Sequence, residues 1–238
     1  MAEQSQQTRI LVVDDQGLIQ EGLIRIISQQ KDLVWCGAVD GVAAARKAVV
    51  LHKPDLILVD LLLPDGCGLE MIRDLISENP NLLTLVISQC DEMLYAERIL
   101  KVGARGYVMK NRAISEIPKA IRAVLSGEYY FSPRVAALAL HRMAAGRPEN
   151  QRTGVGNLTD RELLVFQLLG AGVDTKGVAV KLHVSIKTVE THRENIKHKL
   201  KLSGAAELIR HATHWVNSQS SSHRHLTGEI AKDVGAGP

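Results

Sequence analysis

Aromatic side chains are scarce in this sequence, with Phe, Trp and Tyr making up only 3% of its 238 residues. This scarcity argues against a ligand-sensing domain whose pocket is lined by aromatic rings. Cysteine is also rare, and Cys36, Cys67 and Cys90 lack the paired spacing of a zinc site, so buried reduced thiols are expected. No run approaches the ~20 apolar residues that span a bilayer, and residues 1–9 lack the apolar core of a signal peptide. A cytoplasmic protein without a membrane segment is expected.

Neither sign of charge dominates the chain, but the basic residues are unevenly placed. Residues 8–126 contain 14 basic and 15 acidic side chains, whereas residues 157–218 contain 9 basic and 6 acidic ones. The second segment also carries five histidines, which add positive charge below neutral pH. A weakly basic module near the C-terminus favours nucleic acid over an acidic partner.

Short apolar runs alternate with helical periodicity up to residue 126. The runs predicted as strands are Ile10–Asp14, Leu33–Val39, Leu56–Asp60, Leu82–Ser88 and Gly106–Lys110. The stretches predicted as helices are Gly17–Ser28, Val42–Leu51, Gly68–Glu78, Met93–Val102 and Ile114–Ser126. Right-handed crossovers between parallel strands produce this alternation. The sequence therefore predicts an α/β domain at residues 8–126, with a doubly wound, five-stranded parallel sheet.

The pattern changes after this domain. Residues 127–156 contain several glycines and prolines and are predicted to form a linker, with room for a helix at 134–143. The strand signal is then lost, and Thr159 with Glu162 forms a capping box that opens a helix. A small all-α domain at residues 157–218 is predicted, with helices at Asp160–Leu169, Thr175–Leu182, Ile186–Leu200 and Ala205–Val216. The tail at residues 219–238 is predicted to be disordered.

Asp60 ends a strand so apolar that both of its faces are expected to be buried. Asp14 and Asp15 end the first strand, and ligands of open parallel sheets bind beyond the carboxyl ends of the strands. Three converging carboxylates repel one another unless a divalent cation lies among them, and Mg²⁺ prefers oxygen ligands. Ser88 and Lys110 end the fourth and fifth strands and add a hydroxyl and a cation. This set suits the positioning and charge neutralisation of a transferring phosphoryl group.

Each of these side chains, taken alone, also fits a solvated strand end or a turn. The phosphoryl interpretation depends on their joint occurrence, because four of the five predicted strands finish on such a residue.

Residues 8–126 resemble the receiver domain of two-component response regulators, which has a flavodoxin-like fold. The resemblance implies that Asp60 accepts a phosphoryl group from a sensor histidine kinase. It also implies that Mg²⁺ is bound by Asp15, Asp60 and the backbone carbonyl of Leu62, with Asp14 acting through water. The three residues of the implied switch are Ser88, Tyr107 and Lys110.

The switch follows from the charge that phosphorylation adds. A phosphoryl group brings about −1.5 to −2 charges and three strong acceptor oxygens, to which Ser88 and Lys110 can bond. Inward movement of Ser88 would vacate space, and Tyr107 could then rotate from an exposed to a buried position. This change is expected to alter the surface of the fourth helix, fifth strand and fifth helix.

The segments from Leu158 to Glu162 and from Lys181 to His192 resemble the LuxR-type helix-turn-helix. Together with the receiver-like half, the chain is similar to the NarL/FixJ class of transcription regulators. A helical wheel of Ile186–Leu200 separates two faces. The apolar face holds Val189, Ile196 and Leu200. The polar face holds Lys187, Thr191, Glu194 and His198.

The polar face is predicted to enter the major groove of DNA. The resemblance implies base-facing positions for three residues: Glu190, Thr191 and Glu194. Phosphate contacts are expected from Ser185, Lys187, Thr188 and Lys197. The competing interpretation is that the charged residues form only i, i+3 ion pairs on a solvated helix. Trp215 of the last helix fits either a dimer contact or the packing of the module's own core.

The sequence therefore predicts a phosphorylation-controlled, DNA-binding transcription regulator that forms a homodimer when phosphorylated. In this interpretation the resting receiver restrains the helical module. An enzyme of the aspartyl-phosphate phosphatase class is not predicted, because it would need a second Asp two residues after Asp60, where this chain has Leu62. An output module that binds protein or RNA is the remaining alternative.

Overall fold

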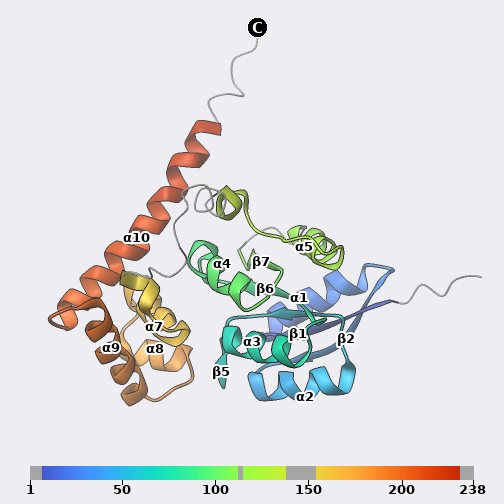
Figure 1. The fold of residues 1–238 in the computed structure, drawn as a ribbon, viewed down its shortest axis with the longest axis horizontal. Helices are drawn as coiled ribbons and strands as arrows, with labels where there is room; N and C mark the ends of the chain where they lie inside the picture. Colours follow the sequence, from blue (N-terminus) through green and yellow to red (C-terminus); the bar gives the residue numbers. More distant parts are fainter. Residues whose placement is uncertain (1–6, 112–114, 138–153, 231–238) are drawn as a thin grey trace, which may run out of the picture. The chain divides into compact units, whose positions relative to one another are not determined.

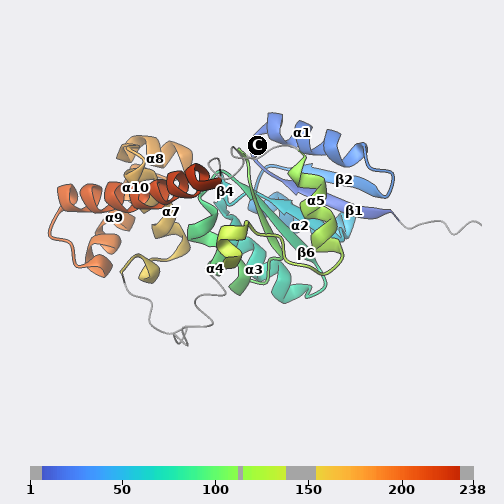
Figure 2. The ribbon, with the colours of Figure 1, turned by 90° about the horizontal axis from the view of Figure 1, so that it is seen from above.

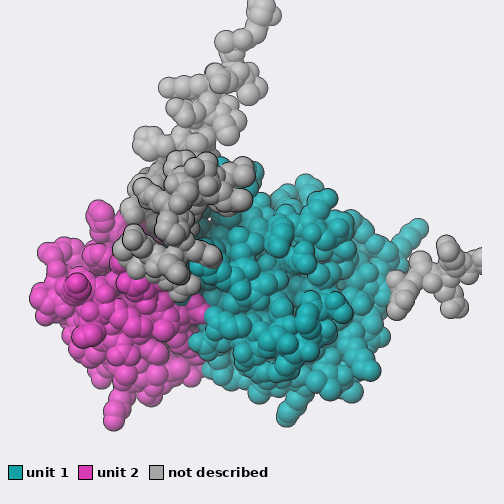
Figure 3. Space-filling model, viewed as in Figure 1, with its two compact units in different colours: residues 1–147 teal, residues 148–238 magenta. Residues whose placement is uncertain are grey.

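The computed structural model describes residues 7–111, 115–137 and 154–230, with side chains up to residue 217 in the last helix. Two compact units are present, residues 1–147 and residues 148–238 (Figure 3). Over the described residues, all strands belong to the first unit and the second is helical. No helix among these residues has both the length and the apolarity needed to cross a bilayer.

Five parallel strands form the main sheet of the first unit, in the order β2-β1-β3-β6-β7 (Figure 1). The strands are β1 Thr8–Val13, β2 Leu33–Val39, β3 Leu56–Val59, β6 Leu83–Ser88 and β7 Gly106–Met109. The helices between and after them are α1 Gly17–Ser28, α2 Val42–His52, α3 Gly68–Glu78, α4 Glu92–Lys101 and α5 Glu116–Leu125. The predicted doubly wound α/β fold is confirmed.

Burial on both faces explains the apolar sequence of the central strands. All four residues of β3 are buried. On one face, Ile10 and Val12 of β1 share a core cluster with Leu23 and Ile27 of α1 and Ile121 of α5. Figure 1 shows α2 and α3 on the opposite side of the sheet from α5. A sheet packed on both faces holds its strand ends rigidly, and the candidate site lies at those ends.

A short hairpin that the sequence did not predict follows β3. Strand β4 at residues 62–63 pairs antiparallel with β5 at residues 66–67. Asp65 lies in its turn and accepts hydrogen bonds from the amides of Val42 (2.6 Å) and Ala43 (2.9 Å). The N-cap residue Gly41 has no side chain to bond these amides, so a carboxylate from a distant part of the chain satisfies them instead. The hairpin is therefore attached to the start of α2.

Part of the predicted linker lies against the outer edge of β7. The amide of Tyr107 donates to the carbonyl of Tyr130 (2.8 Å), and the amide of Tyr130 donates to the carbonyl of Arg105 (2.9 Å). Residues 133–137 are helical, and the remainder of the helix predicted at 134–143 lies outside the described residues. The first unit thus continues beyond α5, because this segment supplies partners to an edge strand that would otherwise be open.

The second unit begins with a 3-10 turn, η1 Gly154–Asn157, and continues with helices (Figure 2). These are α7 Asp160–Gly170, α8 Thr175–Lys181, α9 Ile186–Leu200 and α10 Ala205–Ile230. The predicted capping box is present: Thr159 Oγ1 accepts from the amide of Glu162 (3.3 Å), and Glu162 Oε2 accepts from the amide of Thr159 (2.7 Å).

Helix α10 is longer than the sequence predicted. It runs to Ile230, whereas its expected end was Val216 and a disordered tail was expected at 219–238. Residues 219–230 are helical in the structure, and residues 231–238 lie outside the described residues. The sequence from 217 to 230 contains no proline and one glycine, so it has almost no residue that interrupts a helix.

Gly68 begins α3 in contact with the backbone of Asp60, since a Cβ at this position would lie 2.2 Å from the Asp60 carbonyl oxygen. The Gly68→Ala variant is therefore expected to lose about 1–3 kcal/mol in the free energy of unfolding. Gly22 lies within α1 with no atom within 4 Å of such a Cβ, so Gly22→Ala is expected to gain up to ~1 kcal/mol. Chemical denaturation measures both, and a shift of the same sign in the two variants would contradict this packing.

Candidate functional site

Three carboxylates converge at the carboxyl ends of β1 and β3. Asp14 and Asp15 follow β1, and Asp60 follows β3. Asp14 and Asp60 are buried, whereas Asp15 is exposed. One oxygen of each side chain lies within 4.8 Å of those of the other two. The amide of Asp60 donates to the carbonyl of Val13 (2.9 Å), so the two strand ends are held side by side.

Lys110 follows β7 and reaches both buried carboxylates. Its Nζ lies 2.7 Å from Asp14 Oδ2 and 2.6 Å from Asp60 Oδ2. Burial by itself lowers the pKa of a lysine, but Asp60 and Asp14 outweigh this effect and raise the pKa of Lys110 above its ordinary value. The lysine is therefore a permanent positive charge between two negative ones.

Both carboxylate oxygens of Asp14 have a partner within the chain. Its Oδ1 accepts from the amide of Gln16 (2.9 Å), and its buried Oδ2 pairs with Lys110 Nζ (2.7 Å). Burial raises the pKa of Asp14, against the lowering effects of Lys110 and of the Gln16 amide. The convergence of oxygens from three separate carboxylates fits a hard divalent cation such as Mg²⁺, which takes oxygen ligands and retains waters.

Ser88, Cys90 and Tyr107 form a chain of hydrogen bonds that starts at Asp60. The Ser88 hydroxyl donates to Asp60 Oδ1 (2.6 Å), and the Cys90 amide donates to Ser88 Oγ (3.4 Å). Tyr107 is buried, and its hydroxyl donates to the Cys90 carbonyl (2.6 Å). Burial raises the pKa of Tyr107 well above its ordinary value, so the hydroxyl keeps its proton. The tyrosine thus occupies the inward position of the predicted switch.

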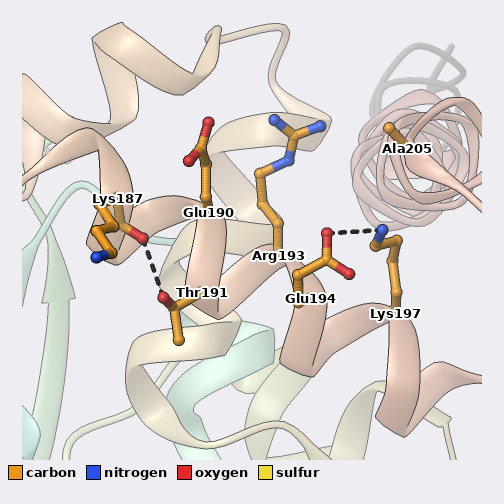
Figure 4. Close-up of a pocket in the computed structure, with 7 residues that line it drawn as sticks. All are labelled: Lys187, Glu190, Thr191, Arg193, Glu194, Lys197 and Ala205. Carbon is orange, nitrogen blue, oxygen red and sulfur yellow. Dashed lines mark hydrogen bonds and ion pairs between the residues drawn. The ribbon is translucent and has the colours of Figure 1, made fainter.

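The two faces of α9 are separated as the helical wheel predicts. Val189 and Ile196 are fully buried. The polar face is exposed at Lys187, Thr191, Glu194 and His198. A groove of about 430 Å³ lies along this helix (Figure 4). It is lined by Lys187, Glu190, Thr191, Arg193, Glu194, Lys197 and Ala205.

Some side chains of this face already have partners within the unit. Lys197 Nζ lies 2.8 Å from Glu194 Oε1, which confirms one of the i, i+3 ion pairs considered from the sequence. Arg193 donates to Thr175 Oγ1 at the start of α8 (2.6 Å).

The predicted phosphate contacts Ser185 and Thr188 lie at the N-terminus of α9. Ser185 Oγ accepts from the Thr188 amide (3.0 Å) and lies 2.8 Å from Thr188 Oγ1. The Ser185 hydroxyl therefore caps the first turn of α9, at the end of the helix whose dipole favours anions.

Comparison with known proteins gives matches to both units. Residues 10–122 match the family described as response regulator receiver domain, and residues 156–212 match the family described as bacterial regulatory proteins, luxR family. The oxygen regulatory protein NreC of Staphylococcus carnosus is 32% identical over 209 residues, which cover 86% of this chain and 96% of NreC. NreC of Staphylococcus aureus (strain JH9) is 33% identical over 213 residues, with the same coverage. The chain belongs to the response regulators.

Solved structures of response regulators are similar as well. The two-component response regulator of the LuxR family from Aurantimonas sp. SI85-9A1 has 28% identity and a TM-score of 0.54, covering 58% of this chain and 99% of its own. RcsB from Salmonella enterica serovar Typhimurium, bound to the promoter rprA with the phosphomimetic BeF3−, has 21% identity and a TM-score of 0.58, covering 87% and 98%. The comparison with RcsB shows that this chain has the same fold as RcsB. The family is one of transcription regulators rather than enzymes.

Two residues that position the response regulator's acidic site were missed from the sequence. Gln20 of α1 donates through Nε2 to the carbonyls of Asp14 (2.5 Å) and Val39 (3.1 Å), so it joins the ends of β1 and β2. Asp65 caps α2 as described above. The Asp65-Gly66 pair signals a turn, but nothing local indicates a capping partner 22 residues away.

Glu162 joins α7 to α9 in the second unit of this response regulator. The Glu162 oxygen of the capping box, Oε2, also accepts from Lys199 Nζ (2.7 Å). Burial by itself raises the pKa of Glu162, but Lys199 and the amide and hydroxyl of Thr159 outweigh it and lower the pKa. Burial also lowers the pKa of His192 on α9.

The second unit is therefore expected to lose stability at acidic pH. The contribution of Glu162 is fully present above its ordinary pKa and is lost as the pH falls through the lowered folded value. His192 acts in the same direction below its ordinary pKa of 6.5, because the unfolded imidazole takes up a proton more readily than the buried one. Thermal unfolding from neutral pH to below 4.5, the ordinary pKa of a glutamate, measures this. Glu162→Gln is expected to flatten the acidic part of the profile relative to the exposed control Glu190→Gln. A profile of Glu162→Gln as steep as that of the control would contradict the assignment.

Trp215 packs within the helical unit. Its ring lies edge-on to Phe166, with centroids 5.3 Å apart. Gly170 allows α7 and α10 to approach closely, since a Cβ there would lie 2.5 Å from the Ala212 carbonyl oxygen. Of the two roles expected for Trp215, core packing is the one that the structure contains.

Proposed function

We propose that phosphorylation of Asp60 by a sensor histidine kinase controls how this response regulator binds DNA and regulates transcription. The observation that carries this proposal is the arrangement of Asp14, Asp60, Ser88 and Lys110, in which the buried nucleophile already accepts from a hydroxyl and an ammonium group. We place this activity in the cytoplasm, the compartment of the chromosome.

Asp60 is the proposed nucleophile. One of its oxygens attacks the phosphorus of the phosphohistidine, the P–N bond breaks, and an acyl phosphate forms. Asp15, Asp60 and the carbonyl of Leu62 would hold Mg²⁺, with Asp14 acting through water, and the ion when bound supplies charge neutralisation. Lys110 stabilises the negative charge at the same position, since its raised pKa keeps it protonated.

Ser88 and Tyr107 form the proposed switch. Phosphorylation adds negative charge and three strong acceptor oxygens at Asp60, so it would hold the Ser88 hydroxyl inward more firmly. The inward Ser88 leaves room for the buried Tyr107, whose hydroxyl contacts the Cys90 carbonyl. The proposed effect of phosphorylation is therefore to favour the inward arrangement over an outward one.

The polar face of α9 is the proposed DNA-reading surface. Glu190, Thr191 and Glu194 would face base edges, with glutamate accepting from cytosine N4. The phosphate contacts would come from Ser185, Lys187, Thr188 and Lys197, with His198 farther along the same face. We propose that phosphorylation releases the helical unit from a restraint by the receiver, and that two copies then bind a two-fold DNA site.

Genome-wide footprinting tests the proposal directly, using the wild type and Asp60→Ala, each with and without acetyl phosphate. We expect discrete protected sites for the wild type, with occupancy that rises on phosphorylation. The Asp60→Ala variant should show no such rise. Absence of specific sites for the wild type under both conditions would reject DNA binding and favour a protein or RNA target.

A further inference from the structure

We propose that residues 128–135, called the edge segment from here on, transmit the state of Asp60 toward the C-terminal unit, and that Glu92 is the positioning residue that fixes this segment. The inference rests on the proposed phosphorylation of Asp60 and adds the route by which that event leaves the receiver. The edge segment is the stretch of chain through which the receiver must continue into the helical unit.

The hydrogen bonds that begin at Asp60 do not end at the switch tyrosine. Tyr107 contacts Cys90 through its side chain and the edge segment through its backbone, because its hydroxyl donates to the Cys90 carbonyl (2.6 Å) and its amide to the Tyr130 carbonyl (2.8 Å). One residue thus touches both the loop that follows Ser88 and the segment that leads to the second unit. A displacement of Tyr107 would disturb both contacts.

Glu92 supplies a second connection between the same two places. It is the first residue of α4, two positions after Cys90, and only 6% of it is exposed. Its Oε1 accepts from the backbone amide of Ser132 (2.7 Å). Burying a carboxylate is costly unless donors compensate it, and a bond to a charged acceptor is stronger than one between neutral groups. The position of Glu92 therefore fixes the position of Ser132.

The receiver surface is shaped to accept the edge segment. A Cβ on Gly106 of β7 would lie 3.0 Å from the Tyr130 carbonyl oxygen and 3.1 Å from Tyr130 Cβ, so the absence of a side chain lets the segment approach. The Tyr130 hydroxyl donates to Glu116 Oε2 of α5 (2.5 Å), and Val135 is 5% exposed. The segment is thus anchored from β7, α4 and α5.

These contacts indicate whether phosphorylation orders or loosens the edge segment. In the structure, Ser88 is bonded to Asp60 and Tyr107 lies inward. The Tyr107 hydroxyl then donates to the Cys90 carbonyl, and Glu92 accepts from the Ser132 amide. An outward Tyr107 would remove that donor from the Cys90 loop, which leads directly into Glu92. The edge segment would then lose the bond from the Ser132 amide to Glu92. Phosphorylation, by favouring the inward arrangement, is expected to order the segment.

Hydrogen exchange of the full-length protein, followed by mass spectrometry, tests this inference. Beryllofluoride with Mg²⁺ serves as the phosphoryl mimic. In the wild type we expect it to slow exchange of peptides covering residues 128–135 by about fivefold, as expected for strengthening one buried hydrogen bond. In Glu92→Ala, which removes the acceptor of the Ser132 amide, the slowing should largely disappear, while mimic binding at the peptide containing Asp60 is retained. The matched control is Glu97→Ala, at an exposed glutamate on the same helix, which should behave as the wild type.

The possible outcomes separate the inference from the function on which it rests. If the Asp60 peptide responds to the mimic but the 128–135 peptides of the wild type do not, the edge segment is not the route and the inference is overturned. A full response of these peptides in Glu92→Ala would overturn the role of Glu92. If the Asp60 peptide itself fails to respond, the proposed phosphorylation fails first. Slowing in the wild type and in Glu97→Ala, with loss in Glu92→Ala, supports the inference.

Discussion

Replacement of Asp60 by asparagine is expected to abolish the acyl-phosphate adduct that forms when the protein is incubated with acetyl phosphate and Mg²⁺. The amide has nearly the same shape as the carboxylate. Its oxygen can accept from Lys110 and its nitrogen can donate to the Ser88 hydroxyl, so the fold is retained. It lacks the nucleophilic anion, so no P–O bond forms. Mass spectrometry of the intact protein at neutral pH measures the adduct.

The matched control for this experiment is Asp55→Asn, just before the opposite end of β3. Asp55 accepts from the amide of Arg9 (2.7 Å), a bond that an asparagine oxygen can also accept. This variant should form the adduct to the same extent as the wild type. An adduct of undiminished amount in Asp60→Asn would show that another residue is the acceptor, and the proposed signalling chemistry would have to be abandoned.

Replacement of Lys110 by methionine is expected to destabilise the first unit by about 3 kcal/mol or more in the absence of divalent cations, because it leaves two buried carboxylates without their counterion. The side chain of Lys110 is 7% exposed, and those of Asp14 and Asp60 are 2% and 0% exposed. Mg²⁺ should restore more stability to the variant than to the wild type, since a bound cation supplies the missing charge and binding to the folded state adds to its stability. Thermal unfolding with and without Mg²⁺ measures both effects.

Lys119→Met is the control for loss of a lysine. Lys119 is 67% exposed at the side chain and pairs with Glu116 on the surface of α5, where such a pair contributes about 1 kcal/mol at most. A Lys110→Met protein as stable as this control without Mg²⁺ would contradict the buried ion-pair arrangement. An equal effect of Mg²⁺ on both variants would contradict the proposed metal site.

The convergence of the acidic residues was predictable because it depends on strand order alone. Once β1 and β3 are parallel neighbours, Asp14 and Asp60 must lie at the same edge, and burial of β3 follows from its apolar residues. The separation of Val189 from Thr191 on α9 follows equally from the helical period. In these places local pattern and tertiary structure agree.

The positions of Asp65, Gln20 and Tyr130 could not be derived from local pattern. Each makes a bond to a residue distant in sequence, and many surface residues of the same type make none. The linker prediction was too broad for a related reason: glycine and proline around residues 127–133 indicate a turn, but not that the chain after it pairs with β7. Such contacts depend on which edge of the sheet remains open, and this is known only after the fold is complete.

On the exposed face of α9, an acidic neighbour already engages one of the lysines proposed to contact DNA. Each cation that contacts a DNA phosphate displaces about one condensed counterion, and the number displaced sets how steeply affinity falls as salt rises. With Lys197 bound to Glu194, one counterion fewer would be exchanged per monomer. The proposed binding to a promoter would then weaken less steeply when cellular ionic strength rises under osmotic stress.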